Sequence, residues 1–306
     1  MAKSPRHLLT LEELSSKELH KLLELAAQVK KKPAKYKKAL KGQTLGMIFE
    51  KSSTRTRVSF EVGMFQLGGH ALFLNGNDIQ IGRGETIPDT AKVLSRFVQG
   101  IMVRTFAHST VETLAKHADV PVINGLTDSH HPCQILADLQ TLQEHYGKLK
   151  GRQVVFVGDG NNVAHSLMIG SAMMGMNFKL VCPKGYEPDA AILKRVQKQG
   201  DKNGSRIEVT TKVEGSVRGA DAVYTDVWTS MGQEAEKAKR LKDFAGYQVN
   251  ERLMAESPKA VFLHCLPAHR GEEVSAGVMD GERSLVWDEA ENRLHAQKAL
   301  MITLMG

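Results

Sequence analysis

The sequence predicts an α/β protein with two domains of similar size, each a parallel sheet flanked by helices. Its 306 residues are about two domains' worth, at roughly 150 residues per domain. Short apolar runs typical of buried strands alternate with amphipathic stretches typical of helices, which is the pattern of a parallel sheet. A glycine-bounded segment, residues 147–151, lies near the middle and is expected to be the hinge between the domains.

The first domain begins with a helix whose start is marked by Ser15 and Glu18, a capping-box pair followed by leucines at helical spacing. The sequence then predicts strands at 44–49, 71–74, 101–103 and 120–123, and helices from about 53, at 90–98, at 111–117 and at 132–146. In the helix that starts near residue 53, the apolar residues expected to face the core are Val58, Val62, Met64 and Phe65.

The second domain repeats the alternation after the hinge. Its predicted strands are 154–157, 179–181, 222–225 and 260–263, and its predicted helices are 163–174, 190–198 and a region at 282–290. A last helix, 293–304, is expected to pack back on the first domain. The predicted domains are therefore residues 1–147 with 291–306, and residues 148–290.

Composition favours a cytoplasmic protein without a membrane segment. The apolar runs are far too short to cross a bilayer, and the first residues have no apolar signal core. The three cysteines, Cys133, Cys182 and Cys265, are an odd number and lie far apart, which indicates reduced thiols and no disulfide framework.

The formal net charge of +7 suits an acidic ligand, either nucleic acid or a small phosphate. Six lysines lie between Lys30 and Lys38, and they are interpreted as a solvated helix end and loop, with Pro33 ending the helix. Only Tyr36 accompanies them, so a base-stacking surface for nucleic acid is not expected.

Residues able to bind or react follow several of the predicted strands directly. They are the stretch 53–57, Arg104, His131, the pair Asn161 and Asn162, Asp226, and the pair His264 and Cys265. In open parallel sheets, ligands bind beyond the carboxyl ends of the strands. The sequence therefore predicts an enzyme.

The stretch Ser53, Thr54, Arg55, Thr56 and Arg57 lies between a predicted strand and a predicted helix. A helix N-terminus offers unpaired N–H groups and the positive end of the helix dipole, which suit a phosphate. Hydroxyl groups add donors, and arginine adds a bidentate fork. Simple capping by a hydroxyl residue would not need the two arginines, so the stretch indicates anion binding. The Walker pattern is absent, so a nucleoside triphosphate is not expected.

Arg104 and His131 extend this predicted anion site. Arg104 directly follows the apolar residues 101–103, where it is a candidate second phosphate ligand. His131 precedes a helix that starts at Pro132, and an imidazole near a polarised carbonyl group is a common catalytic device.

Cys265 beside His264 allows two other interpretations. A covalent thiol enzyme would use His264 or His269 as its base, but a nucleophilic thiol leaves the 53–57 stretch unexplained. A structural zinc site needs about four ligands at characteristic spacing, and the chain has no Cys-x-x-Cys. Neither interpretation is preferred, and no metal is predicted.

The turn Gly158-Asp159-Gly160 suggests a dinucleotide-binding oxidoreductase. The fingerprint requires a third small residue where Val163 stands, and an acidic residue roughly 20 positions further on, where the next strand ends without one. A tight strand-to-helix turn is the preferred interpretation, and no cofactor is predicted.

Four motifs together resemble the aspartate/ornithine carbamoyltransferase family. They are Ser53-Thr54-Arg55-Thr56-Arg57, His131-Pro132-Cys133-Gln134, Asp226-Val227-Trp228-Thr229-Ser230-Met231-Gly232 and His264-Cys265-Leu266-Pro267, in the family's order. The resemblance covers essentially the whole chain. It is closest to the ornithine branch, because the aspartate branch has Thr where Cys133 stands and Pro where Cys265 stands.

The resemblance implies a role for each matching residue. On the carbamoyl phosphate side, the residues that would bind the phosphate are Ser53, Thr54, Arg55 and Thr56. Arg104 would bridge phosphate and carbonyl oxygen, and His131 and Gln134 would hold the carbamoyl group. Arg293, and Gln80 from a neighbouring subunit, would add further contacts. On the ornithine side the matching residues are Asn162, Asp226, Ser230, Met231, Cys265 and Leu266. Arg104, His131, Asp226 and Cys265 would be the catalytic residues.

The implied reaction transfers the carbamoyl group of carbamoyl phosphate to the δ-amine of L-ornithine and gives L-citrulline and phosphate. It is a step of arginine biosynthesis or of the urea-cycle type, carried out by family homotrimers or multiples of trimers. The implied partners are these two substrates, with no nucleic acid, membrane, metal or cofactor.

Such a transfer requires a neutral amine, whereas an alkyl amine has a pKa of about 10.4, so about one molecule in a thousand is neutral at pH 7. Asp226 and Cys265 are the candidates that bind and desolvate the diamino acid. The sequence leaves two roles open for Cys265, a base or a group that only orients the amine. A transferase that uses putrescine or an acylated ornithine is the nearest rival, and Asp226 with the Ser230-Met231-Gly232 turn favours a free amino acid.

Overall fold

The computed structural model describes residues 5–81 and 84–306. Two compact units are present: unit 1 comprises residues 1–140 and 291–306, and unit 2 comprises residues 141–290. No helix within the described part of the chain is both long enough and apolar enough to cross a membrane.

Unit 1 is built on a four-stranded sheet with the order β2-β1-β3-β4, and all its strand pairs are parallel. The strands are β1 (Thr44–Phe49), β2 (His70–Asn75), β3 (Gly100–Arg104) and β4 (Val122–Leu126). The N-terminal segment adds a parallel bridge from Leu8 to Ile123 beside β4. All carboxyl ends therefore meet at one edge of the sheet, as expected from the sequence.

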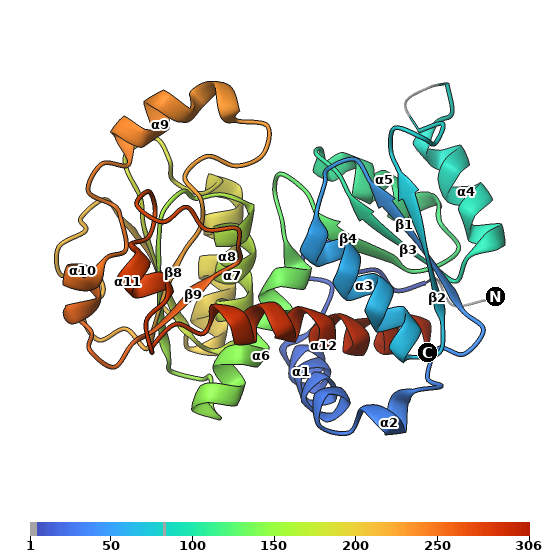
Figure 1. The fold of residues 1–306 in the computed structure, drawn as a ribbon, viewed down its shortest axis with the longest axis horizontal. Helices are drawn as coiled ribbons and strands as arrows, with labels where there is room; N and C mark the ends of the chain where they lie inside the picture. The colour runs from blue at the N-terminus through green and yellow to red at the C-terminus, as the bar shows by residue number, and fades with distance from the viewer. Residues whose placement is uncertain (1–4, 82–83) are drawn as a thin grey trace. The chain divides into compact units, whose positions relative to one another are not determined.

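Helices cover both faces of this sheet (Figure 1). They are α1 (Ser16–Lys31), α2 (Pro33–Tyr36), α3 (Thr54–Gln66), α4 (Ile87–Phe97), α5 (His108–His117), the first part of α6 (Pro132–Tyr146) and most of α12 (Val286–Met305). Apolar residues of α4 and α5 form one core cluster with Ile48, Ile101 and Val103 of the sheet. Helices α3 and α12 pack closely together, since a Cβ at Gly63 would lie 3.0 Å from Met301 Cε.

The prediction for the inward face of α3 was largely wrong. Met64 is buried, but Val58, Val62 and Phe65 are exposed, and Phe65 is 81% exposed. The buried face of α3 instead carries Thr56, Ser59, Phe60, Gly63 and Met64. This face packs tightly on α12 and begins at the predicted anion site, so it contains small and polar residues as well as Phe60. A search for apolar residues at helical spacing therefore did not identify it.

The C-terminal region also differs from the prediction. A single helix, α12, replaces the two helices expected at 282–290 and 293–304. The structure continues the helix through residues 291–292, which lay between the two predicted helices, and Asn292 there is a buried polar residue. The residues of α12 from Glu291 onward belong to unit 1, as expected for a last helix that packs on the first domain.

Unit 2 is built on a five-stranded parallel sheet with the order β7-β6-β5-β8-β9. Its strands are β5 (Gln153–Val157), β6 (Asn177–Val181), β7 (Ile207–Thr210), β8 (Ala222–Thr225) and β9 (Val261–His264). Its helices are α7 (Asn162–Met174), α8 (Ala190–Asn203), the 3₁₀ turn η1 (Glu234–Glu236), α9 (Lys237–Asp243), α10 (Glu251–Ala255) and α11 (Ala276–Met279). Order β6-β5-β8 places the strand-order reversal between β5 and β8, the position where open α/β sheets bind ligands.

The sequence did not predict β7 or the short elements η1, α9, α10 and α11. Strand β7 has four residues at the edge of the sheet and is only partly buried after Ile207, so its hydrophobic signal is weak. Helix α9 is rich in lysine and has Arg240 as its one buried residue, which gives it no apolar face to detect.

Candidate active site

Unit 1 places the predicted phosphate-binding residues at the first turn of α3. Ser53 is the N-cap, and its hydroxyl oxygen accepts a hydrogen bond from the Thr56 backbone N–H at 3.2 Å. Thr54 is exposed, and Arg55 is partly buried. The N–H groups of a first turn point out along the helix axis at its positive end. The turn therefore presents backbone donors, a threonine hydroxyl and a guanidinium in one place.

Arg293 of α12 is brought to the same turn. It is 3% exposed; its Nη1 donates to Gln134 Oε1 at 2.6 Å and its Nη2 to Thr56 Oγ1 at 3.1 Å. Gln297, one helical turn further on, accepts from Arg293 Nε at 3.1 Å and Nη2 at 3.0 Å, and its amide nitrogen donates to Ser59 Oγ at 2.5 Å. This network fixes the guanidinium before any ligand binds.

His131 lies buried among positive charges. Burial holds the pKa of its imidazole well below the ordinary 6.5, and three nearby guanidinium groups lower it further. These groups belong to Arg293, Arg104 and Arg55. The imidazole is therefore neutral at pH 7 and can exchange hydrogen bonds with a carbonyl group without adding charge.

Residues 133 and 134 have different roles at the start of α6. The Gln134 amide is fixed at both atoms, because Nε2 donates to Asp138 Oδ1 at 2.8 Å while Oε1 accepts from Arg293. The Cys133 thiol donates to the Asn124 carbonyl oxygen at 3.3 Å, and burial raises its pKa to about 12. Cys133 is thus a neutral thiol packed in the core, and Gln134 is the residue available to a ligand.

Two more cations lie at the carboxyl ends of neighbouring strands. Arg104 ends β3 and is 7% exposed. Lys51, which the sequence analysis did not select, follows β1 almost directly, is buried, forms an ion pair with Asp128 and has its ammonium 4.3 Å from the centre of the Phe106 ring. Its place directly after a buried strand was the signal that would have identified it.

Gln80 lies apart from these residues in the chain. It is exposed, on a bend between β2 and α4. Residues 82 and 83 of the same segment are outside the described part of the chain. Its expected contribution to a neighbouring subunit is a proposal and is taken up below.

Unit 2 brings Asp226, Cys265 and Asn161 together. Asp226 directly follows β8; its Oδ2 accepts from Asn161 Nδ2 at 2.8 Å and its Oδ1 accepts from the Cys265 thiol at 3.0 Å. Asn161 is also the N-cap of α7, and Asn162 is that helix's first residue. The arrangement gives a carboxylate fixed by neutral donors, which suits the binding of an ammonium group.

His264 is fixed in a way that separates it from Cys265. Its Nδ1 accepts from the Leu266 backbone N–H at 2.9 Å, so the ring proton is on Nε2, which donates to Glu273 Oε1 at 3.2 Å. Both ring nitrogens are therefore engaged by groups other than the Cys265 thiol. The geometry therefore gives no support to a thiol nucleophile activated by His264.

Two groups within the described residues have metal-ligating atoms close to one another. Asp226, His264 and Cys265 form one group, in which the ring nitrogens of His264 are already engaged. The other group comprises His269, Glu272 and Glu273, where Glu272 is paired with Lys237 at 2.9 Å. The trio His264, Cys265 and His269, considered from sequence, is not brought together as one ligand set.

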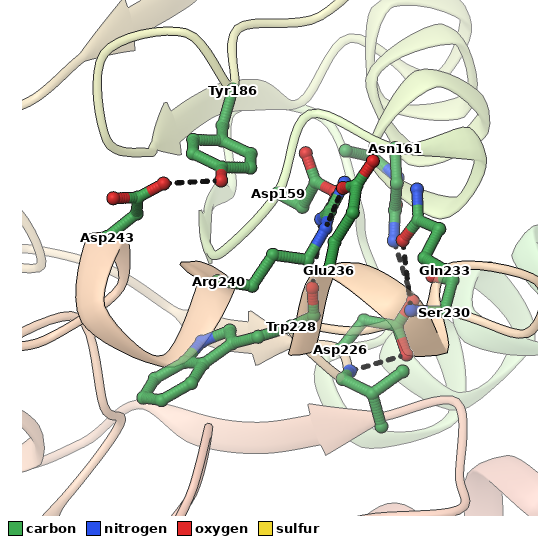
Figure 2. A network of polar contacts seen from close by, with 12 residues as sticks. Asp159, Asn161, Tyr186, Asp226, Trp228, Ser230, Gln233, Glu236, Arg240 and Asp243 are labelled. Atoms are coloured by element: carbon green, nitrogen blue, oxygen red, sulfur yellow. Dashed lines mark hydrogen bonds and ion pairs between the residues drawn. The ribbon is translucent and has the colours of Figure 1, made fainter. Parts of the chain in front are cut away.

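The loop after Asp226 is held by a buried arginine (Figure 2). Arg240 Nη1 donates to Asp159 Oδ2 at 2.7 Å and to the Trp228 carbonyl oxygen at 2.9 Å, and its Nε donates to Glu236 Oε2 at 3.0 Å. Burial raises the pKa of Asp159, and the Arg240 guanidinium opposes that rise. These bonds connect the turn after β5 to the segment that carries the predicted ornithine-side residues.

The tip of this loop is less constrained. The Ser230 backbone N–H donates to Gln233 Oε1 at 3.1 Å, and Met231 is 50% exposed. Ser230 and Met231 therefore lie on an exposed loop anchored at its base, which is the situation of a segment that can adapt to a ligand.

The turn Gly158-Asp159-Gly160 closes on this chain's own backbone. A Cβ at Gly160 would lie 2.5 Å from the Pro188 nitrogen and 2.7 Å from the Tyr186 carbonyl oxygen. Protein backbone therefore occupies the space that a dinucleotide fingerprint leaves for a pyrophosphate, which agrees with the tight-turn interpretation.

Sequence analysis missed Asn161, Gln297 and Arg240 as supporting residues. Gln297 stands four residues after Arg293 on one helix face, so helical spacing was a usable signal. Asn161 was grouped with Asn162 after the strand but was not selected as a partner of Asp226. For Arg240, the only local signal was its i,i+4 pairing with Glu236, because its partners Asp159 and the Trp228 carbonyl are 81 and 12 residues away.

Comparison with known protein families gives two matches that together cover nearly the whole chain. Residues 6–144 match the carbamoyl-P binding domain of aspartate/ornithine carbamoyltransferase, and residues 150–304 match the Asp/Orn binding domain of the same family.

Individual proteins agree with the family matches. The ornithine carbamoyltransferase of Oceanobacillus iheyensis is 57% identical over 304 residues, which covers 98% of this chain and 94% of that protein. The crystal structure of ornithine carbamoyltransferase from Pyrococcus furiosus has 53% identity and a TM-score of 0.95, covering 99% of this chain and 98% of that one. An acetylornithine transcarbamylase complexed with acetylcitrulline is also similar, at 35% identity and a TM-score of 0.89, covering 98% of this chain and 99% of that one.

Proposed function

The chain belongs to the aspartate/ornithine carbamoyltransferase family, and we propose that it is an ornithine carbamoyltransferase. It transfers the carbamoyl group of carbamoyl phosphate to the δ-amine of L-ornithine and forms L-citrulline and phosphate. The observation that carries this proposal is the Asp226–Cys265 pair in unit 2, at 3.0 Å, in a chain whose unit 1 has a buried arginine network at a helix N-terminus.

In the proposed reaction, the first turn of α3 and Arg55 bind the phosphate, with Ser53, Thr54 and Thr56 around it. As the bond from carbonyl carbon to phosphate oxygen breaks, phosphate leaves with the electron pair and takes up the proton that the attacking δ-amine gives up, and these donors neutralise its growing charge. Arg293 holds Thr56 Oγ1 in place beside the ligand and adds positive charge to the site. Together these groups form an anion site whose hydrogen-bond donors are held in fixed positions.

Arg104, His131 and Gln134 are proposed to act on the carbamoyl group. The attack of the amine on the carbonyl carbon places negative charge on the carbonyl oxygen, which Arg104 and the neutral imidazole of His131 stabilise by hydrogen bonds. Gln134 holds the carbamoyl amide with the oxygen that also accepts from Arg293. No covalent intermediate is needed, so positioning of the substrates supplies much of the rate.

Asn162, Asp226, Ser230, Met231, Cys265 and Leu266 are the proposed ornithine-side residues. The Asp226 carboxylate binds the α-ammonium group, and Cys265 lies beside the reacting δ-amine. Because the Cys265 thiol donates to Asp226 and both ring nitrogens of His264 are engaged by other groups, an orienting role for Cys265 fits the geometry better than a role as an activated base.

The acetylornithine enzyme among the similar structures is the second candidate for substrate specificity. Relatives named ornithine carbamoyltransferase have the higher identity, 57% against 35%. A carboxylate at position 226 also suits a free α-ammonium, whereas putrescine has no α-ammonium and an acylated α-amine carries no charge. Free L-ornithine is therefore the preferred substrate.

A homotrimer, or a multiple of trimers, is the proposed assembly. The exposed apolar side chains Val58, Val62 and Phe65 of α3 and Leu72 of the edge strand β2 support it, since such a group of exposed apolar residues marks a protein interface. In this assembly Gln80 completes the carbamoyl phosphate site of a neighbouring subunit.

Mixed assemblies test the shared site. Arg55→Ala and Gln80→Ala chains, each inactive alone, should regain activity when they are unfolded together and refolded as hybrids, because some sites then contain both wild-type residues. Hybrids without activity, with each parent assembled as a trimer by sedimentation velocity, would contradict the placement of Gln80.

The proposal also includes a cytoplasmic location and a role in arginine biosynthesis. All three cysteines are free thiols, two of them buried, which suits a reducing compartment. Neither metal nor cofactor is required, because carbamoyl phosphate already carries its leaving group.

The direct test measures citrulline and phosphate formation from carbamoyl phosphate with L-ornithine, L-aspartate, putrescine and Nα-acetylornithine in parallel. Ornithine should give the highest kcat/KM by at least about two orders of magnitude, as expected when a buried carboxylate is left without its ammonium partner. Equal or faster turnover of putrescine or acetylornithine would overturn the substrate assignment.

A further inference from the structure

Unit 1 contains a second cationic site, at the opposite end of α3 from the proposed carbamoyl phosphate site. A pocket of about 500 Å³ is lined by the end of α1, α2 and the residue after it, the last residue of α3 and the middle of α12, which lie near one another in Figure 1. Helix α3 runs from Thr54 to Gln66, so its two ends are separated by roughly 18 Å at 1.5 Å per residue. The pocket is therefore distinct from the site at Ser53–Thr56.

Lys298 is the central group of this pocket. The residue is 2% exposed, and its ammonium donates to the neutral Gln66 side-chain oxygen at 2.7 Å. It makes no ion pair with a carboxylate among residues 5–81 and 84–306. Burial lowers the pKa of this ammonium. The C-terminus of α3 supplies only about half a negative charge, so Lys298 lacks a full counter-charge.

The other charges of the pocket are also predominantly positive. Lys30 and Lys37 line it, and Glu291 is its one carboxylate. Glu291 is shared, since its Oε1 lies 3.8 Å from the Lys30 ammonium and 3.1 Å from His295 Nε2. Lys37 forms no ion pair with any residue in the described part of the chain. Three lysines therefore face one glutamate that is already engaged.

A polar atom and an apolar wall complete the pocket. The Nδ1 atom of His295 is buried and has no hydrogen-bond partner among the described residues, which leaves a ring nitrogen available to a ligand. Burial lowers the pKa of His295 despite the adjacent Glu291. Because the Glu291 carboxylate can only accept, Nε2 carries the proton of the neutral ring and Nδ1 is left as a hydrogen-bond acceptor. Pro33, Ala34 and Leu294 provide apolar surface beside these groups.

We propose that this pocket, formed by Lys298, Lys37, Lys30 and His295, binds a small phosphate monoester. The phosphate supplies the counter-charge that Lys298 lacks and accepts hydrogen bonds from the ammonium groups, and His295 Nδ1 accepts one from a hydroxyl group of the ligand. The organic part lies against Pro33, Ala34 and Leu294, and a pocket of about 500 Å³ is larger than phosphate alone requires. This site also gives a function to part of the lysine run 30–38, which the proposed enzyme activity does not use.

The test uses the full-length enzyme with Arg55→Ala as the background, so that phosphate binding at the proposed carbamoyl phosphate site does not contribute. Isothermal titration with inorganic phosphate and with glycerol 3-phosphate, at ionic strength held constant with potassium chloride, should give one saturable site per chain. Tighter binding of the ester than of inorganic phosphate would support the proposal, and equal or weaker binding of the ester would overturn the assignment of a monoester.

Variants locate this binding. Lys298→Met keeps the side-chain length, and Lys37→Ala changes an exposed residue, so the second remains informative if the first fails to fold. Each should weaken binding about ten- to hundredfold, the loss expected for one charge-assisted hydrogen bond. Lys38→Ala is the matched control, because Lys38 belongs to the same run and does not line the pocket. No saturable binding in the Arg55→Ala background, or equal weakening by Lys37→Ala and Lys38→Ala, would overturn the proposal.

Discussion

In unit 1 the proposed phosphate-side groups Arg104, His131 and Arg293 are buried, whereas in unit 2 the proposed ornithine-side loop leaves Met231 50% exposed. The guanidinium of Arg293 has partners on α3, α6 and its own helix. Asp226, by comparison, is fixed by Asn161 and Cys265, while Ser230 and Met231 lie at a loop tip.

The difference follows from the charges of the two ligands. A doubly charged phosphate needs several donors in fixed positions, and moving the buried Arg293 at the moment of binding would cost its hydrogen bonds to Gln134 and Thr56. L-ornithine carries its α-ammonium at one end of a short aliphatic chain and its reacting amine at the other, so it needs a carboxylate for the ammonium and a surface that can close over the chain. We therefore expect substitutions on the phosphate side to act mainly on the chemical step and substitutions on the loop side to act mainly on ornithine affinity.

The largest expected effect is that of Arg55→Ala. Loss of one preorganised donor at the leaving group should lower kcat/KM for carbamoyl phosphate by about 10²- to 10³-fold. Steady-state kinetics with both substrates would measure it. Arg57→Ala is the matched control from the same motif: Arg57 pairs with Glu61 at 3.1 Å and stacks on Phe73 at 3.7 Å, so activity should fall no more than a few-fold. Equal losses in the two variants would refute the assignment of Arg55.

A smaller effect, on the other substrate, is expected for Asp226→Asn. The amide keeps the shape but removes the negative charge, so kcat/KM for ornithine should fall by about 10²-fold, while the Kd for phosphate is unchanged. Steady-state kinetics measure the effect on ornithine, and calorimetry measures the Kd for phosphate separately. If Asp226→Asn also weakened phosphate binding, the phosphate side and the ornithine side would not act independently, contrary to this expectation.

His131 gives a prediction for the dependence of stability on pH. Because burial and three arginines lower its pKa in the folded state, the unfolded chain binds the proton more readily below about pH 6.5. Stability from this group is full above pH 6.5 and is lost, by up to about 1.4 kcal/mol per pH unit, as the pH falls toward the folded pKa. Urea unfolding of the wild type and of His131→Asn between pH 7.5 and about 5 would test it. If the free energies of unfolding of the two proteins changed in parallel with pH across this range, the lowered pKa of His131 would be contradicted.

The smallest effect concerns the thiols. Burial raises the pKa of both Cys133 and Cys182 to about 12, so neither should react with a thiol reagent at pH 8 in the folded protein. Cys265 is partly exposed and should be the one cysteine labelled. Mass spectrometry of the labelled peptides gives the result, and saturating ornithine should slow the labelling. Labelling of Cys133 at a comparable rate would place it outside the core.

Much of the fold was predictable because the signals were local. Strand 44–49 and helix 132–146 were predicted with the bounds that the structure shows, since a run of apolar residues and a proline at a helix start are unambiguous. The helix predicted at 90–98 begins earlier, at Ile87, because Thr86 caps it and Pro88 lies in its first turn. The parallel arrangement of both sheets, inferred from alternation, is confirmed.

The candidate site was predictable to the extent that its residues follow strands. Asp226 and Cys265 come after two adjacent strands of unit 2, and the structure places them in contact. The partners that hold the site residues were not predictable. Gln297 acts through Arg293, and Arg240 through Asp159, in contacts whose presence depends on how distant segments pack.

The sequence by itself determined the alternation of strands and helices, the caps, and the residues that carry the chemistry, because each depends on neighbours within a few positions. Only the tertiary structure decided which face of α3 is buried, that α12 is one helix, and that the imidazole of His131 is neutral. Those properties depend on burial and on charges brought from distant parts of the chain, and no local pattern encodes them.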